Sequence, residues 1–82
     1  MDDAIGEQEV GEIVAGVRAG RITLGGGPSY SGWRVSVENG RVVRSSWLQD
    51  DDGAMRCEVK EIGDEEVAAA LRTFGRKVVR RS

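Results

Sequence analysis

This 82-residue chain contains no histidine, one cysteine and one proline, and it has only four aromatic residues: two tryptophans, a tyrosine and a phenylalanine. The lack of histidine removes the commonest general base and the commonest metal ligand, so we expect neither an enzyme nor a bound cofactor. The single cysteine, Cys57, excludes an intramolecular disulfide and is typical of a reducing, cytoplasmic setting.

Long hydrophobic runs are also missing, because no apolar stretch approaches the ~18 residues that a membrane span needs. The first ten residues are acidic and lack the basic-then-apolar order of a secretory signal. Hydrophobic residues make up 39% of the chain and charged residues 32%, a balance typical of a folded globular protein. We therefore predict a single small domain over residues 1–82.

Charge is distributed unevenly along the chain. Residues 1–20 carry five acidic side chains and one arginine, whereas residues 72–82 carry five basic side chains and no acid. One interpretation is that the two ends lie close together and neutralise each other. The other is that the basic end, whose residues 76–82 are expected either to fray or to add a short edge strand, meets an anionic partner.

The pair Asn39-Gly40 lies between two alternating apolar runs and predicts a β-hairpin. A two-residue turn at Asn39-Gly40 and a three-residue loop over 38–40 differ by one position in register, and that slip moves every side chain to the opposite face. The three-residue loop gathers more apolar side chains on one face, so we choose it. That face would then consist of Trp33, Val35, Val37, Val43 and Trp47.

A second turn is expected at Asp51-Asp52-Gly53, again with three residues and a glycine in the left-handed region. It would set Trp47 opposite Cys57 and bring Met55, Cys57 and Val59 onto the same apolar face as the first hairpin. The fourth strand would then run over 54–62. A strand over 21–24 and a flexible glycine-rich loop over 25–32, displaying Tyr30, precede the hairpins.

Two helices flank these strands. Apolar residues recur at helical spacing over 4–19, with Gly20 placed to end that helix. Gly16 and two further glycines inside it suggest a backbone that lies close against another element. Asp64 is expected to cap a second helix that Gly75 ends. The predicted fold class is α+β: a four-stranded antiparallel meander with an N-terminal and a C-terminal helix packed on one face, in the order αββββα.

The opposite face of this predicted sheet carries a basic row. In the chosen register Arg34 faces Arg44 and Arg44 faces Lys60, an arrangement of like charges that costs stability unless a partner offsets it. Arg56 and Leu48 lie on the same face. Together with Tyr30 on its loop and the acidic turn, the candidate partner-binding residues are Tyr30, Arg34, Arg44, Leu48, Asp50, Asp51, Asp52, Arg56 and Lys60. Adjacent aspartates of a tight turn rarely converge on one ion, so no metal is expected.

Two functions fit these features. The first is a small protein-binding module, an inhibitor or regulator that contacts a partner with an acidic surface. Phage-encoded inhibitors of bacterial defence systems, such as anti-CRISPR proteins, are of this kind. The alternative is a nucleic-acid-binding domain that uses the basic face and the basic tail, although the net charge of −2 opposes it. A homodimer is a third possibility, because a one-sided sheet with a free edge often self-associates.

The order helix, antiparallel strands, helix resembles that of the double-stranded-RNA-binding domain. That family would imply a cluster of lysines at the start of the last helix. This chain has Asp64-Glu65-Glu66 there, and three acids would repel phosphate. The resemblance is therefore one of element order, and the family is not assigned.

Overall fold

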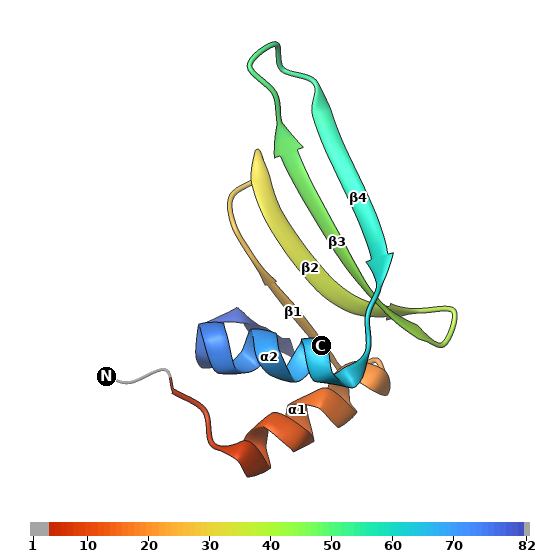
Figure 1. Cartoon of the computed structure of the whole chain (residues 1–82), viewed down its shortest axis with the longest axis vertical. Coiled ribbons are helices and arrows are strands. Elements are labelled where there is room, and N and C mark those ends of the chain that lie inside the picture. The colour runs from red at the N-terminus through yellow and green to blue at the C-terminus, as the bar shows by residue number, and fades with distance from the viewer. Residues whose placement is uncertain (1–3, 82) are drawn as a thin grey trace.

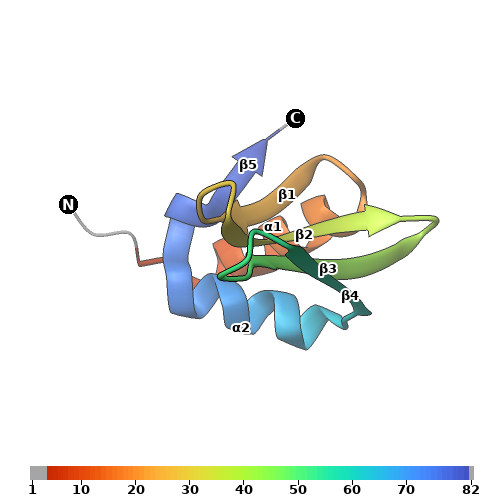
Figure 2. The ribbon, with the colours of Figure 1, turned by 90° about the horizontal axis from the view of Figure 1, so that it is seen from above.

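The computed structural model describes residues 4–81 and places a five-stranded antiparallel sheet beside two helices (Figure 1). The elements in chain order are α1 (Glu7–Arg18), β1 (Ile22–Gly26), β2 (Ser31–Glu38), β3 (Arg41–Gln49), β4 (Met55–Glu61), α2 (Asp64–Phe74), a 3-10 turn η1 (Gly75–Val78) and β5 (Val79–Arg81). The strands lie side by side in the order β4-β3-β2-β1-β5. The predicted α+β meander between two helices is confirmed, and the basic end adds a fifth, edge strand beside β1 (Figure 2).

Both helices pack on one face of the sheet. Their buried residues form one cluster with the apolar side chains of β1, β2 and the start of β3, namely Val10, Ile13, Val17, Ile22, Leu24, Val35, Val42, Ile62, Val67 and Leu71. We call this side the helix-side face and the other the open face. The far ends of β3 and β4 extend past the helices as a two-stranded ribbon (Figure 1).

Two glycines explain where α1 ends and how closely it packs on the sheet. Gly20 has a φ of 81°, and its N–H bonds the carbonyl of Val17 while Arg21 N–H bonds that of Gly16. This is the Schellman arrangement, which satisfies the last carbonyls of the helix. A methyl group at Gly16 would collide with the Cδ1 atom of Ile22. The predicted close approach of the α1 backbone is therefore confirmed at Gly16, and it allows α1 to lie directly on β1.

The first hairpin turn differs from the prediction. Asn39 and Gly40 both have positive φ, 54° and 78°, and Glu38 pairs with Arg41. This is the two-residue turn whose twist matches that of the flanking strands. The choice of a three-residue loop was wrong because it assumed that all apolar residues of the hairpin share one buried face. Val42 lies in the core instead, whereas Val43 and Trp47 lie on the open face.

The second turn is confirmed as a three-residue loop. Gly53 has a φ of 88°, and the N–H of Asp50 donates a 2.7 Å hydrogen bond to the carbonyl of Ala54. Trp47 pairs with Cys57, as predicted, and Ser45 pairs with Val59. Because Trp47 is on the open face, Met55, Cys57 and Val59 are on that face too, rather than against the helices.

The glycine-rich segment is mostly strand rather than flexible loop. Gly25 and Gly26 belong to β1, and Gly32 belongs to β2. Only residues 27–30 connect the two strands. A Cβ atom at Gly32 would lie 2.8 Å from the ring of Trp47, so this glycine gives the indole room to lie flat on the sheet. The segment was misread because composition alone does not distinguish a mobile loop from a strand that another side chain covers.

The start of α2 also differs from the prediction. Gly63 occupies the cap position, and no side chain there bonds the first turn. Asp64 is the first residue of the helix, where its carboxylate favours the positive end of the helix dipole. That carboxylate forms an ion pair with Arg18 at the end of α1. Gly75 ends the helix as predicted, with a φ of 75°.

Candidate functional site

The predicted basic row is divided between the two faces of the sheet. Arg34 pairs with Ser45 on the open face, whereas Arg44 pairs with Val35 and Lys60 on the helix-side face. The prediction that Arg34 faces Arg44 is therefore wrong, and its cause is the one-residue difference at the first turn. The Arg44–Lys60 pairing is confirmed, because it depends only on the second turn.

Arg44 lies at the rim of a groove between α2 and the sheet. Its guanidinium carbon lies 5.9 Å from the ring centroid of Trp33, within cation–π range. The Trp33 ring is in turn 5.2 Å from that of Phe74. These three side chains and Glu66 line a groove of about 270 Å³. Arg44 therefore lies against the Trp33 ring at the edge of the core while its side chain stays exposed.

The open face carries a continuous line of apolar side chains along β3 and β4. We call this line the apolar strip, and it consists of Val43, Trp47, Met55, Cys57 and Val59. Val59 is 62% exposed and Met55 47%. Cross-strand and diagonal neighbours on one face of a sheet lie within ~8 Å of one another. The strip is thus one contiguous apolar surface that no described element of the chain covers.

A hollow of about 310 Å³ lies beside the apolar strip, above the glycines of β1. Gly25 lacks a side chain on this face, and the indole of Trp47 forms one wall while its Nε1 donates a 3.4 Å hydrogen bond to the carbonyl of Pro28. Arg34 and Arg80 also line the hollow. The open face therefore combines exposed apolar area with two arginines, one of them from the C-terminal strand β5.

The remaining predicted site residues are dispersed. Tyr30, in the β1–β2 connection, is 59% exposed, and Leu48, on the helix-side face of the ribbon, is 55% exposed. Arg56 and Lys60 lie on the same side as Leu48. In β4, where Arg56 and Lys60 reside, all seven residues are exposed. The structure thus gives the ribbon two accessible faces, of which only the open face is mainly apolar.

The acidic turn bonds largely to itself. Asp50 accepts a 2.9 Å hydrogen bond from Arg56 Nε, and Asp52 Oδ1 accepts a 3.2 Å hydrogen bond from the N–H of Ala54. Asp51 is exposed. Over residues 4–81, no three Asp, Glu, Cys or His side chains gather in a way that could hold a metal ion. These contacts stabilise the turn through Asp50 and Asp52, while the carboxylate of Asp51 stays exposed to solvent.

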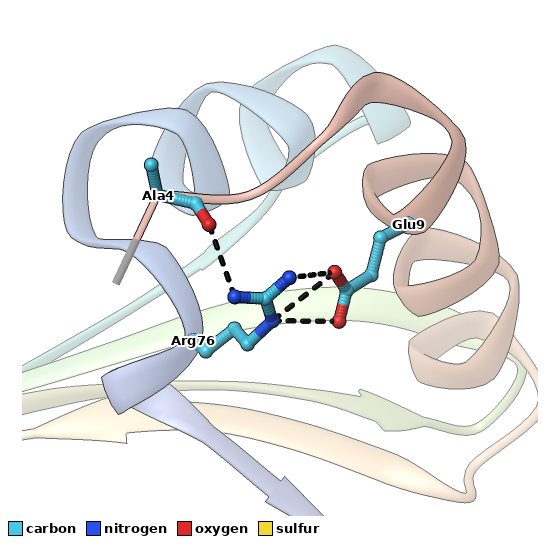
Figure 3. Close-up of polar contacts among 3 residues, drawn as sticks. All are labelled: Ala4, Glu9 and Arg76. Carbon is cyan, nitrogen blue, oxygen red and sulfur yellow. Dashed lines mark hydrogen bonds and ion pairs between the residues drawn. The ribbon is translucent and has the colours of Figure 1, made fainter. Parts of the chain in front are cut away.

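The two oppositely charged ends of the chain meet, as one interpretation of the sequence predicted. Arg72 Nη2 donates to Glu7 Oε1 at 2.6 Å. Arg76 Nη2 donates to Glu9 Oε1 at 2.5 Å, and its Nη1 donates to the carbonyl of Ala4 at 3.1 Å (Figure 3). The hydrogen bonds from these arginines hold the pKa of both glutamates below the ordinary value.

The sequence contained the signal for the open face, although the signal was assigned to the wrong side. In β4, apolar Met55, Cys57 and Val59 alternate with charged residues, which is typical of a strand with one apolar face. We predicted that this face packs inward. The hollow and the part played by Arg80 could not be predicted, because both depend on β5 pairing with β1 across most of the chain.

None of the helices within residues 4–81 has the length and apolar content needed to cross a membrane. Comparison of the chain with protein-family models, with curated proteins and with solved structures found no match.

Proposed function

We propose that this protein is a non-enzymatic protein-binding module and that its partner docks on the open face of the sheet. The apolar strip carries this proposal. A contiguous apolar surface on the uncovered side of a sheet is typical of an interaction site, because exposing it to water is unfavourable. The adjacent glycine hollow gives a docked side chain a recess, with the rigid indole of Trp47 as one wall.

The chemistry of the open face also indicates the kind of partner. Arg34 and Arg80 border the hollow next to the apolar strip. Glu61, an acidic residue on the same face, forms an ion pair with Arg41 at 3.5 Å. A segment that offers apolar side chains flanked by carboxylates would complement this surface. We further propose, as the sequence suggested, that the protein acts as an inhibitor or regulator by binding its partner. A phage-encoded inhibitor of a bacterial defence system is one example of such a protein.

A matched pair of substitutions tests which face is used. Val59→Glu places a charge in the apolar strip, and Leu48→Glu makes the same kind of change at a similarly exposed aliphatic residue on the helix-side face. Proteins captured from cell extract by the unmodified chain are identified first. We expect Val59→Glu to weaken the captured complex roughly tenfold or more and Leu48→Glu to leave it unchanged. Loss with Leu48→Glu alone would refute the open-face site.

A second pair tests the arginines. Arg34→Glu should repel an acidic partner at the hollow, whereas Arg44→Glu changes the same charge on the other face. Binding that survives Arg34→Glu but is lost with Arg44→Glu would move the site to the groove beside α2. Circular dichroism of each variant confirms that the fold is retained.

The nucleic-acid alternative has less charge available than the sequence suggested. Two of the five basic side chains of residues 72–82, Arg72 and Arg76, form ion pairs with Glu7 and Glu9. A gel-shift assay with single- and double-stranded nucleic acids at low salt tests this alternative directly, since phosphate binding is strongest there. We expect no shift.

A further inference from the structure

The outer strand β4 has a free edge whose backbone groups follow a fixed pattern. The carbonyl of Ala54 accepts from Asp50 and the N–H of Ile62 donates to Val42, so even-numbered residues of β4 bond β3. Hydrogen-bonded pairs alternate along an antiparallel ladder. The N–H and C=O groups of Met55, Cys57 and Val59 therefore point away from β3. Among the described residues no strand pairs with this side of β4.

The side chains of β4 are complementary to a second copy of the same strand. When two β4 strands pair antiparallel with Cys57 opposite Cys57, Arg56 of each copy faces Glu58 of the other. Met55 of each copy then faces Val59 of the other. Opposite charges and apolar pairs placed directly across a ladder stabilise it. The charged pairs lie on the helix-side face and the apolar pairs on the open face.

The neighbouring registers are less favourable. With Glu58 at the centre, two glutamates face each other and Arg56 faces Lys60, so like charges oppose each other throughout. With Val59 at the centre, Glu58 faces Lys60, but Arg56 faces Ile62, Met55 loses its apolar partner and Cys57 faces Glu61. Only the register centred on Cys57 pairs the outward backbone groups over 54–60 and balances every charge within 55–59.

We infer that a second copy of this chain occupies the free edge of β4, in an isologous dimer centred on Cys57. The two-fold axis of such an antiparallel pair runs perpendicular to the sheet, so two five-stranded sheets become one continuous sheet. The helices of both copies lie on the same side of it. The two apolar strips then adjoin across the axis on the open face. A seven-residue edge alone buries little area, so we expect a reversible dimer.

Charge exchange at Arg56 and Glu58 tests the dimer without changing the open face. Analytical ultracentrifugation over increasing concentration should show the 8.9 kDa chain converting to a species of twice that mass. Arg56→Glu and Glu58→Arg should each remain monomeric, because each places like charges across the axis. An equimolar mixture of the two variants should dimerise again, and so should the double variant. A protein that stays monomeric at millimolar concentration, or single variants that dimerise normally, would overturn the inference.

Cysteine cross-linking tests the register. Hydrogen-bonded partners have Cα atoms ~5.5 Å apart, which is within the range that a disulfide spans. Mild oxidation should therefore convert the dimer to a covalent one through Cys57. In the matched control, Val59→Cys in a Cys57→Ser background, the two thiols would lie four positions apart along the strands, at ~13 Å. Faster cross-linking of this control than of the native Cys57 would rule out the proposed register.

The dimer and the proposed open-face binding site can each fail without the other, so their tests are independent. Arg56 and Glu58 point to the helix-side face, so a monomeric protein could still bind a partner on the apolar strip. Conversely, a dimer that pairs through β4 leaves the open face uncovered. Failure of the dimer would remove only the edge pairing, and failure of the Val59→Glu test would remove only the open-face site.

Discussion

The two halves of the sheet differ in what surrounds them. In β1 and β2, Ile22, Leu24 and Val35 lie beneath the helices and are at most 6% exposed. On the other side of the sheet, where the far ends of β3 and β4 form the ribbon, every residue of β4 is exposed. This small protein therefore concentrates its core in one half of the sheet and its accessible apolar surface in the other. Stability and binding should therefore respond to different substitutions.

The largest effect on stability is expected in the half of the sheet that the helices cover, which we call the covered half. Leu24 is fully buried, and Leu24→Ala should lower the free energy of unfolding by ~2–5 kcal/mol through lost burial and a residual cavity. Met55→Ala, at a half-exposed apolar residue of β4, should lower it by less than ~1 kcal/mol. Urea unfolding of both variants measures the difference. Equal losses would show that the ribbon contributes to the core as much as β1 does.

A smaller effect is expected where α1 meets the covered half. Gly16→Ala introduces a methyl group against Ile22 and should cost ~1–3 kcal/mol of stability. Gly11→Ala, on the same helix with no atom within 4 Å of the new methyl group, should instead stabilise by up to ~1 kcal/mol. Thermal unfolding shows the sign of each change. If Gly16→Ala were as stabilising as Gly11→Ala, the Ile22 side chain would not pack against α1 as tightly as the structure shows.

The smallest effect is expected at the exposed ion pairs between the chain ends. The lowered pKa of Glu9 arises first from its hydrogen bond with Arg76. Because the pKa is lower in the folded state, the pair contributes its full stabilisation above the ordinary glutamate pKa of ~4.3, and the contribution is lost as pH falls from there through the lowered pKa of the folded state. Glu9→Gln should lower the unfolding midpoint slightly at neutral pH, and this loss should shrink as the solution is acidified below pH ~4.

Glu12→Gln provides the control for that measurement. Glu12 lies on the same helix and, among the described residues, forms no ion pair. Its substitution should not change the midpoint at neutral or acidic pH. A pH-independent loss in Glu9→Gln would indicate that packing of the side chain, rather than its charge, stabilises the chain ends.

Local chemistry was sufficient to predict most of the fold. Gly20 and Gly75 mark the ends of the helices, Asp51-Asp52-Gly53 forms its predicted turn, and apolar spacing identifies both helices. The register at Asn39-Gly40 was not predicted, because two turns were possible and the choice rested on a single buried face. That assumption fails for a ribbon that extends past its helices. The candidate site moved to the open face for the same reason.

The contacts between the chain ends also have a consequence for the entropy of the chain. Glu7 and Arg72 are 65 positions apart and Glu9 and Arg76 are 67 apart, whereas the hairpin turns join residues a few positions apart. The entropy lost on closing a loop grows with the logarithm of its length. The ion pairs therefore close loops that span most of the described chain, and Arg76, which bonds both Glu9 and Ala4, restrains the N-terminal segment at two points.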